Sequence, residues 1–125
     1  MPFLSHRFQG ALRLLPFLVC LIMPSTGFPH AVVTESSLAK TAIKAHHPTK
    51  VVLLFNTHVE LALSRVFLVS AGDVFHPAEI SNGQHDGELL IQLPSLEPGD
   101  YAIKYKVFAA DGHLTENNIR FHVAP

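Results

Sequence analysis

The sequence of 125 residues contains no tryptophan, one cysteine and two methionines. Cys20, Met1 and Met23 all precede residue 30, so residues 30–125 contain no sulfur atom. This part of the chain cannot form an internal disulfide, and it has no thiolate or thioether to offer a metal ion. Any fold it adopts must be stabilised by its own core.

Charged residues are also scarce, at 15% of the sequence. Arg7 and Arg13 precede residue 30, so residues 30–125 carry 7 of the 9 lysines and arginines but all 10 acidic residues, a net charge of −3 with neutral histidines. No basic cluster is evident in the sequence. This composition argues against nucleic acid as a partner and predicts that the domain does not insert into a membrane.

Residues 1–29 have the pattern of a secretory signal peptide. Two arginines precede an uncharged apolar run over 14–23, and small residues follow it. The run is shorter than the roughly 20 residues that a membrane-spanning helix needs, and an uncleaved anchor or a buried helix is the alternative. Cleavage is expected after Gly27 or after Pro29. Only the second cut, or later trimming of Phe28 and Pro29, makes His30 the first residue of a domain over 30–125.

Short β-branched or alternating segments fill the rest of the chain, and no window has the 3.6-residue period of a long helix. The predicted strands are 30–36, 51–55, 65–69, 74–80, 88–93, 101–107 and 119–123, with loops or turns at 37–48, 81–87 and 94–100 and a short helical or crossing segment at 59–63. Residues 51–55 are expected to be buried on both faces of their strand, and Tyr101 and Tyr105 to face the core. These patterns predict an all-β fold, a small antiparallel Greek-key sandwich or barrel of immunoglobulin-like appearance.

Histidine is abundant, with 8 of the 9 histidines in residues 30–125. Asp111 and His113 flank Gly112, so their side chains share a face if the segment is extended. Gly112 would let the backbone bend between them. His30, if it is N-terminal, offers a ring nitrogen and a free amine to the same metal ion. The alternative is an ordinary Asp-Gly turn with a solvated His113.

Together His30, Asp111 and His113 would provide three nitrogens and one oxygen. Such a set suits tetragonal Cu(II), although Ni(II) shares the geometry and Zn(II) accepts the same donors in tetrahedral form. Sulfur ligands select Cu(I), so their absence predicts a Cu(II) site without a Cu(I) site. Binding is expected to weaken as the pH falls through about 6, because the imidazoles must be neutral.

The other histidines are weaker candidates. His46, His47 and His58 could form a second site or extend the first, and solvated loop positions are the alternative. Adjacent residues on a strand point to opposite faces, so His46 and His47 are not expected to bind one ion together. His76 and His85 are expected in loops, and His122 on the polar face of the last strand.

Four segments occur in an order that is typical of one family. They are His30–Val33, Pro48 followed by Val51–Phe55, Leu96–Tyr101 with its Pro-Gly pair, and Ala110–His113. With the leader before them, these segments resemble the CopC family of periplasmic copper-binding proteins over nearly all of residues 30–125. The resemblance implies an immunoglobulin-like β-barrel or sandwich that binds Cu(II) through His30, Asp111 and His113. The chain departs from the family pattern at Thr57, near a position that is often acidic, and it lacks the methionine-rich Cu(I) loop of some members.

The expected function is therefore a periplasmic, non-enzymatic carrier or buffer of Cu(II) in copper homeostasis or resistance, with one Cu(II) site. By analogy with the family, an inner-membrane copper transport protein (CopD-like) is the expected partner. Two alternatives stay open. The first is a histidine-brace copper oxygenase similar to lytic polysaccharide monooxygenases, in which Asp111 would fill a position that the brace leaves open. The second is a metal-free immunoglobulin-like interaction module, which Phe28 and Pro29 would favour if they stay attached.

Overall fold

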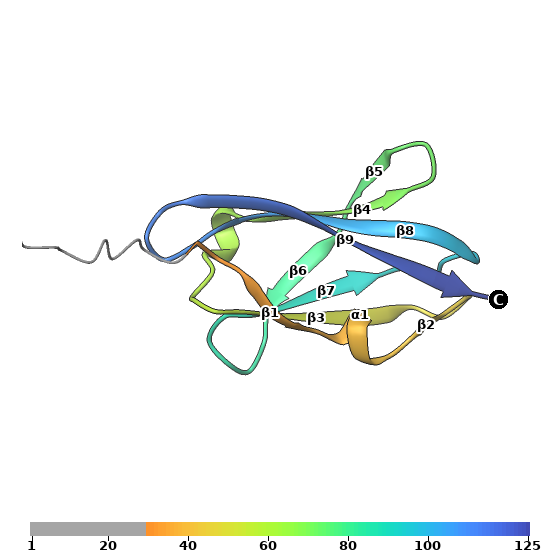
Figure 1. Ribbon diagram of the computed structural model, residues 1–125, viewed down its shortest axis with the longest axis horizontal. Helices are drawn as coiled ribbons and strands as arrows, with labels where there is room; N and C mark the ends of the chain where they lie inside the picture. The colour runs from red at the N-terminus through yellow and green to blue at the C-terminus, as the bar shows by residue number, and fades with distance from the viewer. Residues whose placement is uncertain (1–29) are drawn as a thin grey trace, which may run out of the picture.

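The computed structural model describes residues 30–125, so the predicted signal peptide and its cleavage site lie outside the described residues. This part of the chain forms two β-sheets packed face to face (Figure 1). The elements are β1 (Val33–Ser36), α1 (Ser37–Lys40), β2 (Ile43–Lys44), β3 (Thr49–Phe55), the 3₁₀ turn η1 (Leu61–Leu63), β4 (Arg65–Ser70), β5 (Val74–Pro77), β6 (Glu79–Asn82), β7 (Glu88–Leu93), β8 (Gly99–Phe108) and β9 (Leu114–Ala124). The all-β prediction is confirmed in its sandwich form, since the sheets do not close into a barrel.

The first sheet has the strand order β1-β3-β7-β6, and its neighbours are antiparallel. In β3, Val51, Leu53 and Phe55 face the core and are at most 3% exposed. Val52 and Leu54 face outward and are only half-buried. The prediction of a strand buried on both faces is therefore half right, because only the inner face of β3 is fully buried.

The second sheet has the order β2-β9-β8-β4-β5. The β8–β9 hairpin is its longest pairing, from Gly99 opposite Val123 to Phe108 opposite Leu114. β2 instead runs parallel to the end of β9, which is a departure from the predicted all-antiparallel arrangement. The chain leaves β1 in the first sheet and crosses through α1, so it reaches the edge of the second sheet in the same direction as β9.

The core lies between the inner faces of the two sheets. Tyr105 of β8 is buried as predicted, together with Ile103 and Val107, while Tyr101 is half-buried and packs against the same cluster. The ring of Tyr105 packs edge to face on Phe55 of the opposite sheet, with ring centroids 5.4 Å apart. Burial raises the pKa of the Tyr105 hydroxyl. This aromatic contact ties β8 to β3 in the interior.

Residues 74–80 do not form the single strand that the sequence pattern predicted. They form β5, which pairs with β4 in the second sheet, and the start of β6, which pairs with β7 in the first. The chain changes sheet next to Pro77, which lacks the N–H needed to continue a ladder. His76 consequently lies in β5 and not in a loop.

Two further segments differ from the sequence prediction. Residues 37–48, expected to be a loop or a single turn, contain both the one-turn helix α1 and the strand β2. The last strand begins at Leu114 and not at Ile119. The first residues of β9 are mostly exposed and polar, so the sequence does not predict a strand there, but β8 runs alongside them and pairs with them. No helix within residues 30–125 has the length and apolar character needed to cross a bilayer.

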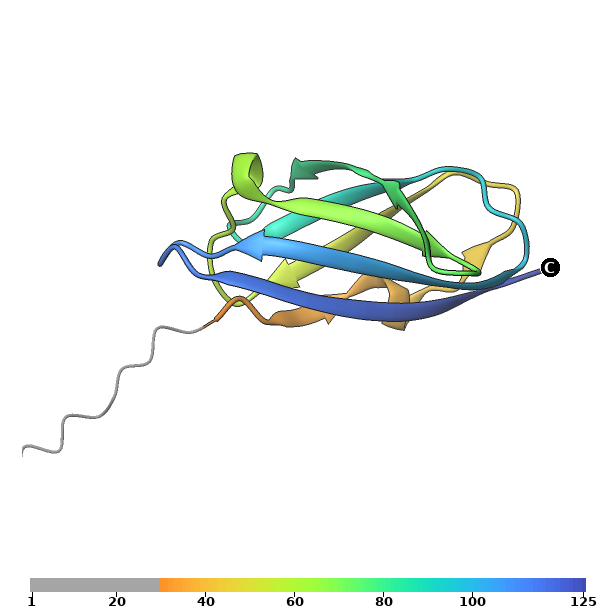
Figure 2. The same ribbon diagram turned by 90° about the horizontal axis from the view of Figure 1, so that it is seen from above.

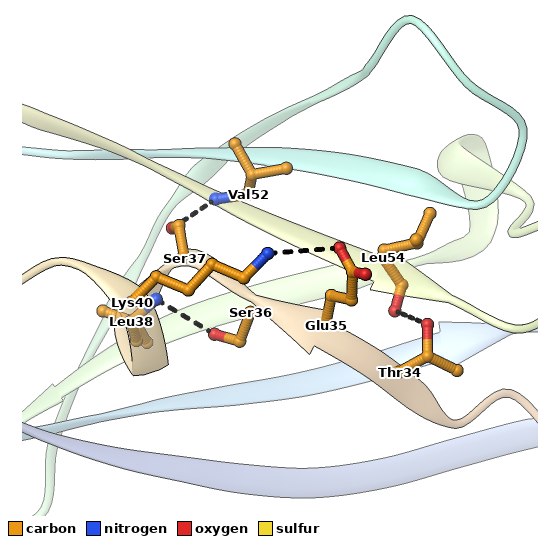
Figure 3. Close-up of polar contacts among 8 residues, drawn as sticks. All are labelled: Thr34, Glu35, Ser36, Ser37, Leu38, Lys40, Val52 and Leu54. Atoms are coloured by element: carbon orange, nitrogen blue, oxygen red, sulfur yellow. Dashed lines mark hydrogen bonds and ion pairs between the residues drawn. The ribbon is translucent and has the colours of Figure 1, made fainter.

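The start of the described chain and the β8–β9 loop lie at one end of the sandwich, and the C-terminus lies at the other (Figure 1, Figure 2). Polar contacts fix the segment that follows His30 against β3 (Figure 3). Thr34 Oγ1 donates to the carbonyl of Leu54 at 3.1 Å, and the N–H of Val52 donates to Ser37 Oγ at 2.9 Å. The sheet therefore determines where His30 lies.

Candidate metal centre

His30 is exposed, but the two residues after it are held in place. Ala31 is 1% exposed. The N–H of Val32 donates to Asn56 Oδ1 at 2.8 Å, and the N–H of Asn56 donates back to the carbonyl of Val32 at 3.0 Å. This reciprocal pair fixes the backbone two residues after His30, so the histidine projects from an anchored segment at the end of the sandwich.

The β8–β9 loop is closed by backbone hydrogen bonds. The N–H of Ala109 donates to the carbonyl of His113 at 3.0 Å, and the N–H of Gly112 donates to the carbonyl of Ala109 at 2.9 Å. Gly112 has φ of 85°, a left-handed conformation that a side chain disfavours, and nothing lies within 4 Å of a Cβ added there. The glycine is therefore needed for the backbone bend, which places Asp111 and His113 on the same side.

Asp111 and His113 contact each other twice. The N–H of His113 donates to Asp111 Oδ1 at 3.0 Å, and His113 Nδ1 lies 2.9 Å from Asp111 Oδ2. The hydrogen bonds from the backbone and then the ring of His113 hold the pKa of Asp111 below its ordinary value. The Asp111 side chain is only 11% exposed, whereas that of His113 is 59% exposed. Asp111 is thus an ionised, largely covered carboxylate beside an accessible imidazole.

The rings of His30 and His113 meet at this end of the sandwich. Their centroids are 5.7 Å apart and their planes are inclined by 77°. All three residues predicted from the sequence therefore lie together. Residues 30–125 nevertheless contain no group of three or more His, Asp or Glu side chains already arranged to hold a metal ion. The Asp111 carboxylate is directed at His113 in this arrangement.

His58 lies beside the candidate site, but its ring is engaged elsewhere. Its carbonyl accepts from the N–H of Ala110 at 3.1 Å, which links it to the β8–β9 loop. Its Nδ1 lies 2.6 Å from Asp86 Oδ1, and its Nε2 lies 3.5 Å from Glu60 Oε1. The hydrogen bond with Asp86 is the main cause that raises the pKa of His58. Because both ring nitrogens of His58 face carboxylates, its link to the β8–β9 loop in this arrangement is the backbone hydrogen bond with Ala110.

Of the remaining histidines, His46, His47 and His122 lie at the opposite end of the sandwich, whereas His85 lies at the same end, next to Asp86. β2 pairs with the last residues of β9, so the loop after it, which holds His46 and His47, lies at the end opposite the β8–β9 loop (Figure 1). The idea that these two histidines extend the first site is therefore wrong. His85 lies in the turn between β6 and β7, as predicted. His122 is exposed on β9, also as predicted, and its Nδ1 lies 2.7 Å from Asp100 Oδ1.

The links from His58 to Asp86 and Glu60 escaped sequence reasoning. Asp86 is 28 residues from His58 in the chain, and only the folded sheet brings its turn next to the residues after β3. The N–H of Phe55 donates to the carbonyl of Gly87 at 2.8 Å, which fixes this neighbourhood. No local pattern in the sequence signals it.

The geometry defines a small β-sandwich protein with a group of nitrogen and oxygen donors at one end. Residues 33–124 match the family model of the CopC domain, and the chain belongs to the CopC family. The resemblance predicted from the sequence is confirmed. Asp111 and His113 lie within the matched residues, whereas His30 precedes them.

Two solved structures illustrate the similarity. CopC from Methylosinus trichosporium OB3b is 28% identical with a TM-score of 0.64, over 77% of this chain and 95% of that chain. PcoC, a methionine-rich copper resistance protein from Escherichia coli, shares the fold at 22% identity with a TM-score of 0.56, over 76% of this chain and 99% of that chain. The comparison with curated proteins gives no match.

Proposed function

We propose that this protein binds Cu(II) in the periplasm and acts as a copper carrier or buffer in copper homeostasis or resistance. Membership of the CopC family supports the metal, and PcoC is named a copper resistance protein. The observation that carries the proposal is the approach of the His30 and His113 rings to 5.7 Å, with Asp111 in contact with His113. Residues far apart in the sequence thus converge at one end of the sandwich.

The proposed ligands are the His30 ring and free amine, the Asp111 carboxylate and the His113 ring. The lowered pKa of Asp111 favours the charged form that a metal requires. Because Asp111 now accepts from the His113 ring, binding either exchanges that hydrogen bond for bonds to the ion or uses Nε2 of His113. A short rearrangement within the loop would complete the site.

The proposed metal is Cu(II), held at a single site. Residues 30–125 contain neither methionine nor cysteine, so they offer none of the soft ligands that favour Cu(I). This composition differs from that of PcoC, which is described as methionine-rich. The absence of soft ligands argues against the shuttling of copper between a Cu(II) and a Cu(I) site within residues 30–125.

Delivery to another protein fits the position of the ligands. His30 and His113 are exposed, so an incoming partner can reach the metal without opening the sandwich. We propose export by the signal peptide, a mature chain that begins at His30, and transfer of Cu(II) to an inner-membrane copper transport protein (CopD-like).

The proposal is tested with two forms of the protein, one beginning at His30 and one beginning at Phe28. Calorimetric titration should show one Cu(II) bound tightly by the first form. EPR spectra should show nitrogen-rich tetragonal Cu(II), with one nitrogen fewer for the Phe28 form because its His30 amine is part of a peptide bond. Mass spectrometry of the exported protein should give His30 as the first residue.

Three results would count against the proposal. One is no tight binding by the His30 form, and another is identical spectra from the two forms. The third is reductant-driven peroxide formation or glycan cleavage by the copper-loaded protein, which would favour the oxygenase alternative.

A further inference from the structure

The outer face of the second sheet carries most of the positive charge of the domain. Alternation along the strands points four basic side chains outward: Arg65 of β4, Lys104 and Lys106 of β8, and Arg120 of β9. They are four of the seven lysines and arginines in residues 30–125, and the carboxylates that point outward from the same strands are Glu116 and Asp100. This face is therefore net +2, while residues 30–125 as a whole are −3.

Aromatic side chains lie among these cations. Phe75 of β5 is 47% exposed. Its ring centroid is 5.9 Å from that of Phe67, and Lys104 Nζ lies 5.3 Å from it. We call Arg65, Lys104, Lys106, Arg120, Phe67 and Phe75 the basic face. Exposed aromatic residues flanked by cations are typical of binding surfaces.

Ion pairs within residues 30–125 do not balance most of this charge. Arg65 stands directly opposite Lys106 in the register, and like charges in that position destabilise a sheet. Lys106 reaches Glu116 at 3.6 Å, but within residues 30–125 neither Lys104 nor Arg120 forms an ion pair. These cations are therefore available to carboxylates from another molecule.

We propose that the basic face docks a protein partner that presents carboxylates around an apolar side chain. The apolar group would rest on Phe75 and Phe67, and the carboxylates would pair with Lys104 and Arg120. β9 begins at the residue after His113, so the basic face continues to the candidate metal centre. The proposal goes beyond Cu(II) binding and does not depend on it.

A protein fits this face better than an anionic membrane. Glu116 and Asp100 lie within the face, and Asp100 lines a hollow together with Asp73 and Arg120. These carboxylates would be repelled by anionic lipid headgroups. At a protein interface, mixed charges around a central anchor are ordinary.

The test uses ¹⁵N-labelled, copper-free protein and the peptide Glu-Glu-Phe-Glu-Glu-Phe as the probe, with Lys-Lys-Phe-Lys-Lys-Phe as its control. The acidic peptide should shift amide signals on β4, β5, β8 and β9. Salt at 0.5 M should reduce these shifts, because the screening length of charges shortens with salt, to about 3 Å near 1 M. The double variant Lys104→Glu/Arg120→Glu should bind the acidic peptide more weakly, by about tenfold at least. The variant Lys40→Glu/Lys50→Glu makes the same charge change on the first-sheet side and should bind like the wild type.

Several outcomes would overturn the proposal. They are the absence of shifts on the basic face at millimolar peptide, equal losses in both double variants, or co-sedimentation with phosphatidylglycerol vesicles in place of peptide binding. Lys104→Gln/Arg120→Gln repeats the test if the reversed charges disturb folding. Since no copper is present, failure here leaves the Cu(II) proposal intact, and failure of Cu(II) binding leaves this one intact.

Discussion

The two ends of the sandwich each hold a histidine close to an aspartate, yet the two pairs differ. At one end, His113 Nδ1 lies 2.9 Å from Asp111, whose side chain is 11% exposed. At the other end, His122 Nδ1 lies 2.7 Å from Asp100, whose side chain is 90% exposed. The solvated pair is the shorter one. A short distance therefore does not distinguish a candidate site from an ordinary surface contact.

What distinguishes the first end is convergence. Asp111 receives a backbone hydrogen bond as well as the ring contact, and a second imidazole, that of His30, lies against His113. The Asp100–His122 pair joins two neighbouring strands across the ladder. The assignment of a candidate metal centre therefore rests on the preorganised β8–β9 loop and on His30 as a third donor residue.

The largest difference is expected between variants in which His113 and His122 are each replaced by alanine. His113→Ala should lower Cu(II) affinity by about 100-fold or more, since loss of even an outer-shell partner of a metal site costs 10- to 100-fold. His122→Ala should leave the affinity unchanged. Competition with a chelator of known affinity measures both. Equal losses in the two variants would remove the distinction between the two ends.

The next effect separates backbone strain from metal binding. Gly112 and Gly72 have φ of 85° and 80°, and an added Cβ meets nothing within 4 Å at either position. Gly112→Ala and Gly72→Ala should each lower the free energy of unfolding by about 1–2 kcal/mol, the cost of the left-handed conformation. Only Gly112→Ala should also weaken Cu(II) binding, because it distorts the loop between Asp111 and His113. Urea unfolding and metal titration of both variants provide the check.

Segments with one buried face were predicted well from the sequence. The strand over 88–93 was predicted with the bounds that the structure has, and the face shared by Tyr101 and Tyr105 was also correct. Both segments alternate because sheet packing buries every second side chain. β2 has only two residues, and the change of sheet next to Pro77 depends on which neighbouring strands are available. Such features depend on tertiary structure and leave no periodic pattern.

The candidate site was predictable to the extent that it is local. Asp111 and His113 stand out because one glycine separates them, and the family resemblance added His30. The approach of the two histidine rings and the contacts of His58 with Asp86 and Glu60 follow from long-range strand pairing. Short-range spacing cannot reveal contacts of this kind.

Acid is expected to remove the contribution of the Asp111–His113 pair to the stability of the fold. The pKa of Asp111 in the folded protein lies below its ordinary value of 3.8, so its stabilising contribution is complete above that value and is lost as the pH falls through the folded pKa. Asp111→Asn should therefore be less stable than the wild type near pH 6, with the difference shrinking towards pH 2. Urea unfolding between these limits measures it. A difference that does not change with pH would mean that the carboxylate charge makes no contribution.

The smallest effect concerns His58, which is exposed and lies beside the same end. Its folded pKa is raised above 6.5, mainly by the hydrogen bond with Asp86, so its contribution is present below pH 6.5 and is lost as the pH rises through the folded pKa. Asp86→Asn should lower the NMR titration midpoint of the His58 ring. Wild type and variant should then differ in stability near pH 6 and converge at higher pH. Glu97→Gln, which changes the 3.6 Å contact with His46 at the opposite end, should leave the His58 midpoint unchanged. An equal shift in both variants would mean that the midpoint follows the overall charge and not the contact with Asp86, and His58 would then give no evidence of a local difference between the ends.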